Sequence, residues 1–235
     1  MRFLCLHGRG TNSEIFKRQT DALRHELGDS HSYDFVDGTF PSALNEGLLV
    51  FKPSDQQILT RLDLRELLPP DDETFAYCNP SSPQSCIKAF NDLEHYVQAE
   101  GPYDGVMGFS LGATFAMSWM FKKLREQKDE KPVQLPFKVG IFFSAPGLLQ
   151  YHDLLAGQLF GSKFNPADGL LDIPTAHIWG CHDRDKEKAE AASQACDEAV
   201  RSVFVHDKGH EIPISSDNVI SMAKVINRAI TRAQS

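Results

Sequence analysis

Short apolar runs alternate along the chain with longer segments in which apolar residues recur every three or four positions. The short runs predict buried strands, and the periodic segments predict amphipathic helices. Strands are predicted at 2–8, 33–38, 103–109, 137–145, 174–180 and 201–206. Helices are predicted at 12–27, 86–99, 111–125, 185–198 and 217–232. This alternation is typical of an α/β protein with a mostly parallel sheet flanked by helices.

Two insertions interrupt the alternation, near 39–80 and near 146–173. Both follow the carboxyl end of a strand, which is the edge of an open α/β sheet where ligands bind. We therefore expect cap insertions that shape a pocket, with one helix at 54–70. The apolar side chains expected to line this pocket are those of Phe40, Phe51, Tyr77, Leu155 and Phe160.

The composition is that of an ordinary globular chain. Its 235 residues, of which 41% are hydrophobic and 24% charged, suit a single domain over 1–235. The chain has neither a long apolar run nor the pattern of a secretory signal, and its five cysteines are scattered. We therefore expect a cytoplasmic protein with reduced thiols and no membrane partner. A net charge of −8 argues against a nucleic-acid partner.

The stretch Gly108-Phe109-Ser110-Leu111-Gly112 lies between a predicted strand and a predicted buried helix. That order is the context of a nucleophile elbow, a sharp turn that raises a serine hydroxyl at the edge of the sheet. The glycines two positions before and after the serine suit this turn, because side chains there would strike neighbouring backbone. Ser110 is the predicted nucleophile.

A serine hydroxyl needs a base, and in this order of elements the base follows the last strand. His210 lies in the loop after the strand at 201–206, and Gly209 would let that loop bend over the sheet. His206 is the alternative, but it ends the strand itself. We therefore predict that His210 is the base.

The base in turn needs a carboxylate to orient it, in the loop after the strand at 174–180. Asp183 and Asp185 both follow that strand. Asp183 is the predicted partner, because Asp185 is placed to cap the next helix. Cys181, His182 and these two aspartates could also be read as metal ligands, but adjacent residues point in different directions, so we expect no metal.

Acyl transfer also needs hydrogen-bond donors for the developing oxyanion. The expected donors are the backbone N–H of Leu111 and the backbone N–H of Arg9, in the glycine-flanked loop after the first strand. His7, which ends that strand, is expected to pack this loop rather than to act as a base.

Five stretches together resemble the fungal serine hydrolase (FSH) family of the α/β-hydrolases. They are FLCLHGRGTNSEIFKRQTDALR, YDFVDGTFPS, GPYDGVMGFSLGA, IPTAHIWGCHD and GHEIP. The resemblance implies an α/β-hydrolase fold, a triad of Ser110, Asp183 and His210, and no cofactor. Members of the family include carboxylesterases and thioesterases of fungal polyketide pathways, which release an acyl chain from a carrier protein.

The sequence therefore predicts an enzyme that hydrolyses small acyl esters or thioesters. An acyl-transfer or lactone-forming enzyme on the same three residues stays open, because water and an alcohol can attack the same acyl-enzyme. A binding protein on an inactive hydrolase fold is the alternative from another class. It would usually lack one of the three residues, and this chain has them all.

If an acyl carrier protein delivers the substrate, its acidic surface needs basic residues near the pocket. The candidates are Arg61 and Arg65 on the predicted helix, with Lys52 and Arg9, although Asp63 and Glu66 could pair with the two arginines. Arg61→Glu with Arg65→Glu should slow release from a carrier-bound thioester and leave hydrolysis of an N-acetylcysteamine thioester unchanged. Equal loss on both substrates, measured as kcat/KM, would instead indicate a damaged cap.

Overall fold

The computed structural model describes residues 1–42, 73–127, 135–159, 164 and 169–235. Several predicted features lie outside the described residues. They are the helix at 54–70 with Arg61 and Arg65, Lys52, and the pocket positions Phe51 and Phe160.

Six strands form one sheet in the order β2-β1-β5-β6-β7-β8, and every neighbouring pair is parallel. The strands are β1 Arg2–Leu6, β2 Ser32–Val36, β5 Gly105–Phe109, β6 Val139–Phe143, β7 Thr175–Gly180 and β8 Arg201–His206. Each predicted strand is present, with small differences at its ends. The central strands β5 and β6 are buried along their whole length, which is why their sequences are continuous apolar runs.

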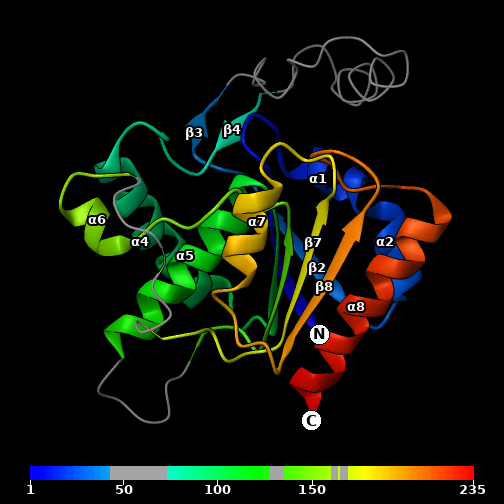
Figure 1. Ribbon diagram of the computed structural model, residues 1–235. Coiled ribbons are helices and arrows are strands. Elements are labelled where there is room, and N and C mark those ends of the chain that lie inside the picture. Colours follow the sequence, from blue (N-terminus) through cyan, green and yellow to red (C-terminus); the bar gives the residue numbers. More distant parts are fainter. Residues whose placement is uncertain (43–72, 128–134, 160–163, 165–168) are drawn as a thin grey trace.

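Helices cover both faces of this sheet (Figure 1). They are α1 Ser13–Gln19, α2 Asp21–Leu27, α4 Pro83–Glu100, α5 Leu111–Glu126, α6 Tyr151–Leu155, α7 Lys186–Ser193 and α8 Ser216–Gln234. Helices α1, α2 and α8 lie on one face, and α4, α5 and α7 lie on the other. Successive side chains of a strand divide between the two cores, so that Phe3 faces α8 and Leu4 faces α5. The predicted α/β fold with a parallel sheet is confirmed.

Two predicted helices differ from the observed ones. The helix predicted at 12–27 is broken at Thr20, whose hydroxyl donates to the carbonyl of Phe16, so that α1 ends and α2 begins there. The helix predicted at 185–198 ends at Ser193. The residues that follow pair instead with Leu171, whose N–H donates to Ala195 O and whose carbonyl accepts from Asp197 N. At Thr20 a local side-chain hydrogen bond accompanies the break. After Ser193 the competing hydrogen bonds come from Leu171, a residue distant in the sequence.

A short antiparallel ladder, which the sequence did not predict, lies at the edge of the first insertion. Strand β3 (Phe40–Pro41) pairs with β4 (Phe75–Ala76). Phe75 also forms an isolated bridge with Thr11, in the loop after β1. Strand β4 therefore ties the ends of the first insertion to the loop that is expected to hold the oxyanion.

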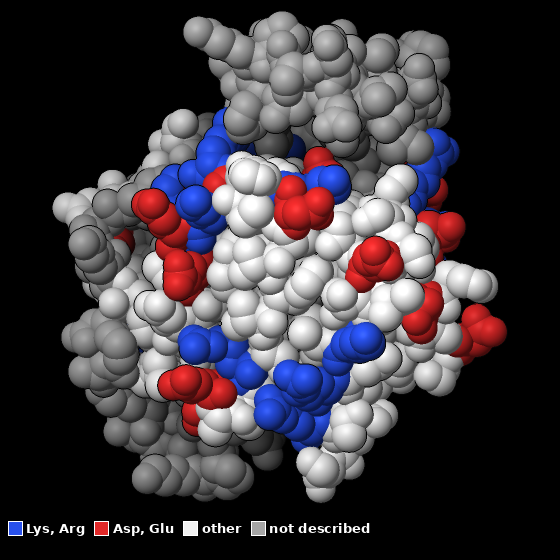
Figure 2. All heavy atoms as spheres, turned by 45° about the vertical axis from the view of Figure 1, so that its right-hand side comes forward, with Lys and Arg blue, Asp and Glu red and all other residues white. Residues whose placement is uncertain are grey.

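The surface carries charges of both signs. On the face shown in Figure 2, basic and acidic side chains form small groups, several of which lie directly beside a group of the opposite sign. The net charge of −8 is therefore not spread as one acidic sheet over this face. Among the described residues, no helix combines the length and the apolar character needed to span a bilayer.

Two buried histidines make the stability of the fold sensitive to acid. Burial lowers the pKa of His177 to about 3, with a smaller effect of Arg201, and burial lowers the pKa of His206 to about 4. An unfolded chain takes up these protons near pH 6.5 and the folded chain does not. Acid therefore favours the unfolded state, and stability is lost as the pH falls from about 6.5 toward the folded pKa values.

We expect each of these histidines to lower the free energy of unfolding by about 2 kcal/mol between pH 7 and about pH 4.5. Urea unfolding at the two pH values measures the loss. His177→Gln should show a smaller loss than the wild type, since glutamine cannot take up the proton. Equal losses in the two proteins would contradict the assignment.

Candidate active site

Ser110 stands between strand β5 and helix α5, in a strained backbone conformation with φ 53° and ψ −117°. The two glycines that flank it are required by close backbone contacts. A Cβ at Gly108 would lie 2.6 Å from Ala113 N, and a Cβ at Gly112 would lie 2.2 Å from Leu6 O. Both distances are far below van der Waals contact. The turn therefore has the geometry of a nucleophile elbow, with the serine side chain at the amino end of α5.

A line of two hydrogen bonds joins Ser110, His210 and Asp183. Nε2 of His210 lies 2.8 Å from Oγ of Ser110, and Nδ1 lies 2.8 Å from Oδ2 of Asp183. Because an ionised carboxylate can only accept a hydrogen bond, Nδ1 of His210 carries the proton and donates a hydrogen bond to Asp183. Nε2 is then free to accept a hydrogen bond from the serine hydroxyl. The Asp183 side chain is fully buried, the His210 side chain is 8% exposed, and Ser110 is 9% exposed. The three hydrogen-bonded residues are thus fully buried at Asp183 and slightly exposed at His210 and Ser110.

Asp183 is held as an ionised acceptor. Burial raises its pKa, but the His210 ring, the backbone N–H of Asp185 and the nearby Ser144 together outweigh burial, so that the net shift is downward. Its second oxygen, Oδ1, accepts from the Asp185 N–H at 2.8 Å. Ser144 directly follows β6 and has a φ of 46°. Its place near Asp183 was not predicted from the sequence, although a serine directly after a buried strand could have indicated it.

The rival residues are occupied elsewhere. The carboxylate of Asp185 lies 2.7 Å from the Lys188 ammonium and 3.5 Å from the Arg184 guanidinium. Asp185 is the residue before α7, as expected, but its side chain forms no capping hydrogen bond. His206 is buried at the end of β8, where its Nδ1 accepts from the Lys208 N–H. The geometry therefore favours Asp183 over Asp185 as the carboxylate and His210 over His206 as the histidine next to Ser110.

The loop that carries His210 folds back across the end of β7. Cys181 N donates to His206 O, and His182 N donates to Lys208 O. A Cβ at Gly180 would lie 2.1 Å from Lys208 O, so this position requires glycine. The expectation that Gly209 is needed for the bend is wrong, because a Cβ there would meet nothing within 4 Å and the φ of Gly209 lies outside the left-handed region.

The loop after β1 passes directly beside Ser110. A Cβ at Gly8 would lie 3.6 Å from the Cβ of Ser110. The N–H of Gly10 is already donated to Phe75 O, at 2.9 Å. Arg9 lies between these two glycines, and Leu111 is the first residue of α5, whose N–H has no partner within the helix. Leu111 thus directly follows Ser110, and Arg9 directly follows the glycine that approaches Ser110, while their role as oxyanion donors stays a prediction.

His7 and Tyr77 hold this loop from below. The His7 N–H donates to the Tyr77 hydroxyl, at 2.6 Å, and that hydroxyl donates to Val36 O. Nδ1 of the His7 ring lies 2.7 Å from Gly8 O and therefore carries a proton, while Nε2 accepts from Gly38 N at 2.9 Å. Burial lowers the pKa of His7, which favours this neutral form. Its contacts agree with the expected packing role.

The described pocket candidates differ in their environment. Tyr77 is 8% exposed and stacks on Phe115, so its ring belongs to the core beneath the loop. Phe40 is half-buried on β3, and Leu155 is 64% exposed on α6. The role of Phe40 and Leu155 in lining a pocket stays a prediction. Tyr77 supports the loop through its hydroxyl, a role that the sequence analysis did not assign to it.

Ligand atoms of Asp183, Asp185 and His210 lie within 4.8 Å of one another, the spacing of a possible cation site. Two of these groups are already joined by the 2.8 Å contact between Nδ1 and Oδ2. The third, Asp185, is paired with Lys188. These contacts account for the cluster as a hydrogen-bonded arrangement.

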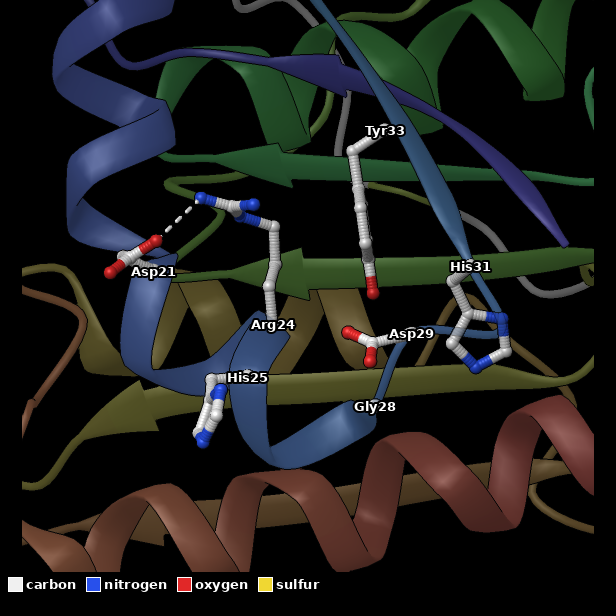
Figure 3. Close-up of a pocket in the computed structure, with 7 residues that line it drawn as sticks. All are labelled: Asp21, Arg24, His25, Gly28, Asp29, His31 and Tyr33. Atoms are coloured by element: carbon white, nitrogen blue, oxygen red, sulfur yellow. Dashed lines mark hydrogen bonds and ion pairs between the residues drawn. The ribbon is translucent and has the colours of Figure 1, made fainter.

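A hollow of about 340 Å³ lies beside the first residues of β2 (Figure 3). Its lining is polar and consists of Asp21, Arg24, His25, Gly28, Asp29, His31 and Tyr33. In Figure 3 the Arg24 side chain extends beside the Tyr33 ring and pairs with Asp21. This hollow lies where β2 begins, whereas Ser110 follows the end of β5, so the two are at opposite edges of the parallel sheet.

The parallel sheet, the strained serine turn and the helices on both faces define an α/β-hydrolase. A family model described as serine hydrolase (FSH1) matches residues 1–222. The chain therefore belongs to the serine hydrolase (FSH1) family and is a hydrolase.

Relatives and solved structures agree with this membership. The esterase FPY3 of Fusarium mangiferae is 35% identical over 237 residues, covering 99% of this chain and 98% of that protein. A probable esterase of Aspergillus terreus is 28% identical, covering 98% and 89%. The crystal structure of acyl-protein thioesterase 2 from Zea mays matches with a TM-score of 0.56 and 14% identity, covering 97% and 93%. A Bacillus cereus carboxylesterase matches with a TM-score of 0.55 and 12% identity, covering 97% and 87%. The two structures show the fold.

The contact at Gly112 makes a testable prediction. Gly112→Ala would force α5 away from β1 and displace Ser110, so we expect a loss of hydrolytic activity on the order of 100-fold. Gly209→Ala is the matched control, since it is next to His210 and has room for a methyl group. Hydrolysis of nitrophenyl butyrate by the two purified variants measures the difference. Similar activity of the two variants would show that the close contact at Gly112 does not position the serine.

Proposed function

We propose that this protein hydrolyses carboxylic esters or thioesters through an acyl-enzyme on Ser110, with His210 as general base and Asp183 as the group that orients it. The observation that carries the proposal is the line of two 2.8 Å hydrogen bonds from the serine hydroxyl to the buried carboxylate. Membership in a serine hydrolase family and the similarity to proteins named esterases support the same reaction.

In the first half of the reaction, Oγ of Ser110 attacks the carbonyl carbon while Nε2 of His210 takes the hydroxyl proton. The imidazolium that forms is stabilised by the ionised Asp183. The same proton then passes from Nε2 to the leaving alcohol or thiol. In the second half, water gives a proton to Nε2 and attacks the acyl group, and the proton returns to Oγ as the acid leaves.

The negative charge on the carbonyl oxygen needs donors that are already in place. We assign this role to the N–H groups of Leu111 and Arg9. The amino end of α5 adds the positive end of its dipole at the same position. One donor of this kind contributes roughly 3 kcal/mol to stabilisation of the transition state.

The same three residues can serve more than one acyl acceptor and more than one form of substrate. Water is the acceptor in hydrolysis, and an alcohol in its place would give acyl transfer or a lactone by the same steps. A free ester or thioester is the simplest substrate, and an acyl group on a carrier protein is the alternative that the charge-reversal experiment at Arg61 and Arg65 tests.

Substitutions of the three residues test the mechanism. We expect Ser110→Ala and His210→Ala each to lower kcat for nitrophenyl butyrate by at least about 10,000-fold. The double variant should be little worse, because the residues act as a unit. Asp183→Asn should lose roughly 1,000-fold, since the imidazole would lose its fixed tautomer.

Asp185→Asn is the matched control, because its carboxylate lies in the same loop and pairs with Lys188. It should retain most of the activity. A fluorophosphonate probe should label the wild type and the control and leave Ser110→Ala unlabelled. An active Asp183→Asn beside an inactive Asp185→Asn would overturn the assignment of the carboxylate, and a fully active Ser110→Ala would overturn the proposed reaction.

A further inference from the structure

Two buried thiols that take no part in the proposed reaction lie side by side. Sγ of Cys78 is 3.0 Å from Sγ of Cys86, and each residue is 1% exposed. Cys78 follows strand β4 closely, and Cys86 lies in the first turns of α4. Their spacing of eight positions carries no motif, so the chain fold alone brings the pair together.

The segment between the two cysteines is held by a compact set of hydrogen bonds. The Asn79 N–H donates to the hydroxyl of Ser85, at 2.9 Å, and the Ser85 N–H donates to the hydroxyl of Ser82, which caps α4. The Cys86 thiol also lies 3.8 Å from Asn79 O. The two sulfur atoms are therefore held in contact, and an S–S bond of about 2.05 Å needs an approach of only about 1 Å.

The two thiols are chemically unequal. The 3.0 Å contact allows either sulfur to donate to the other. Donation by the Cys78 thiol stabilises a thiolate at Cys86, so this hydrogen bond lowers the pKa of Cys86 despite its burial and raises the pKa of Cys78. The amino end of α4 favours a thiolate at Cys86 in the same way. Cys86 is thus placed to react first, with Cys78 beside it to complete the reaction.

We propose that Cys78 and Cys86 are a reversible modification site, a dithiol that a small hydroperoxide oxidises to a disulfide. The Cys86 thiolate attacks hydrogen peroxide and takes up one oxygen as a sulfenic acid, with release of hydroxide. The Cys78 thiol then attacks that sulfur, forms the S–S bond and releases water. Two thiols and one peroxide give one disulfide and two waters, and the peroxide is the oxidant that is reduced.

The position of the pair gives the disulfide a structural consequence. Cys78 directly follows Tyr77, whose hydroxyl accepts from the His7 N–H, and Phe75 pairs with the loop after β1. A bond to Cys86 would fasten this supporting segment to α4 through a covalent link. We therefore expect the oxidised protein to unfold at a higher temperature than the reduced one, by roughly 5 °C.

The test uses the full chain with Cys181→Ser, which removes the exposed one of the five cysteines. The protein is treated with hydrogen peroxide, unfolded in N-ethylmaleimide, digested and analysed by mass spectrometry. We expect a peptide linked between Cys78 and Cys86, which dithiothreitol returns to two free thiols. The rise in Tm should appear with the link and disappear with its reduction.

Two further variants separate the roles of the thiols. With Cys78→Ser, peroxide should leave a sulfenic acid at Cys86 that dimedone traps, because no second thiol is present to resolve it. With Cys86→Ser, Cys78 should stay reduced and Tm should not change. Full alkylation of both cysteines after peroxide, or a disulfide to Cys5 or Cys196, would overturn the proposal. A mapped Cys78–Cys86 disulfide without a rise in Tm would overturn its fastening role. Neither readout uses hydrolytic activity, so the result is independent of the proposed reaction.

Discussion

The close approach of helix α5 to the end of strand β1 is the constraint on which the site depends. Position 112 has no room for a side chain, because the carbonyl oxygens of Leu6 and His7 would lie 2.2 and 2.6 Å from its Cβ. The same contact forces the strained turn at Ser110 and brings Gly8 against the serine. Ser110, the amino end of α5 and the loop after β1 therefore lie together because the two backbones are in contact. The strain is stable because the fully buried β5 and the largely buried α5 fix the turn from both sides.

A second backbone contact assembles the other half of the site. The loops after β7 and β8 pair with each other, and Gly180 lets the carbonyls of Lys208 and Gly209 pass close above the end of β7. This pairing places Asp183 next to His210 and buries the carboxylate. The carboxylate stays ionised because each of its oxygens accepts a hydrogen bond. The cost of burying this charge is thus offset by one hydrogen bond from its own loop and one from the loop after β8. Fixed backbone, rather than long flexible side chains, holds the imidazole in position.

The ladder of β3 and β4 links these elements to the first insertion. Phe75 bonds to the loop after β1, Tyr77 holds His7 from below, and Cys78 meets Cys86 on α4. One short segment therefore joins the proposed oxyanion loop, the core and the pair of thiols of Cys78 and Cys86. A displacement of this segment would also displace the loop after β1, because Phe75 is hydrogen-bonded to that loop beside Ser110.

The sequence by itself determined that helices cover a parallel sheet and which loops carry the candidate residues Ser110, Asp183 and His210. Apolar runs are long enough to mark β1, β5 and β6, and the glycines around Ser110 mark the turn, because these signals are local. The hydrophobic pattern did not show the break at Thr20 or the contact between Cys78 and Cys86, although both involve residues at most eight positions apart. It also did not show the ladder at Phe75, which pairs with residues far along the chain. Local signals also placed the bend at Gly209, where the requirement lies at Gly180. Which of Asp183 and Asp185 meets the imidazole, and whether Tyr77 lines a pocket or supports a loop, only the tertiary structure decided. The reason is that a side chain's role follows from the backbone packed against it, and that backbone comes from another part of the sequence.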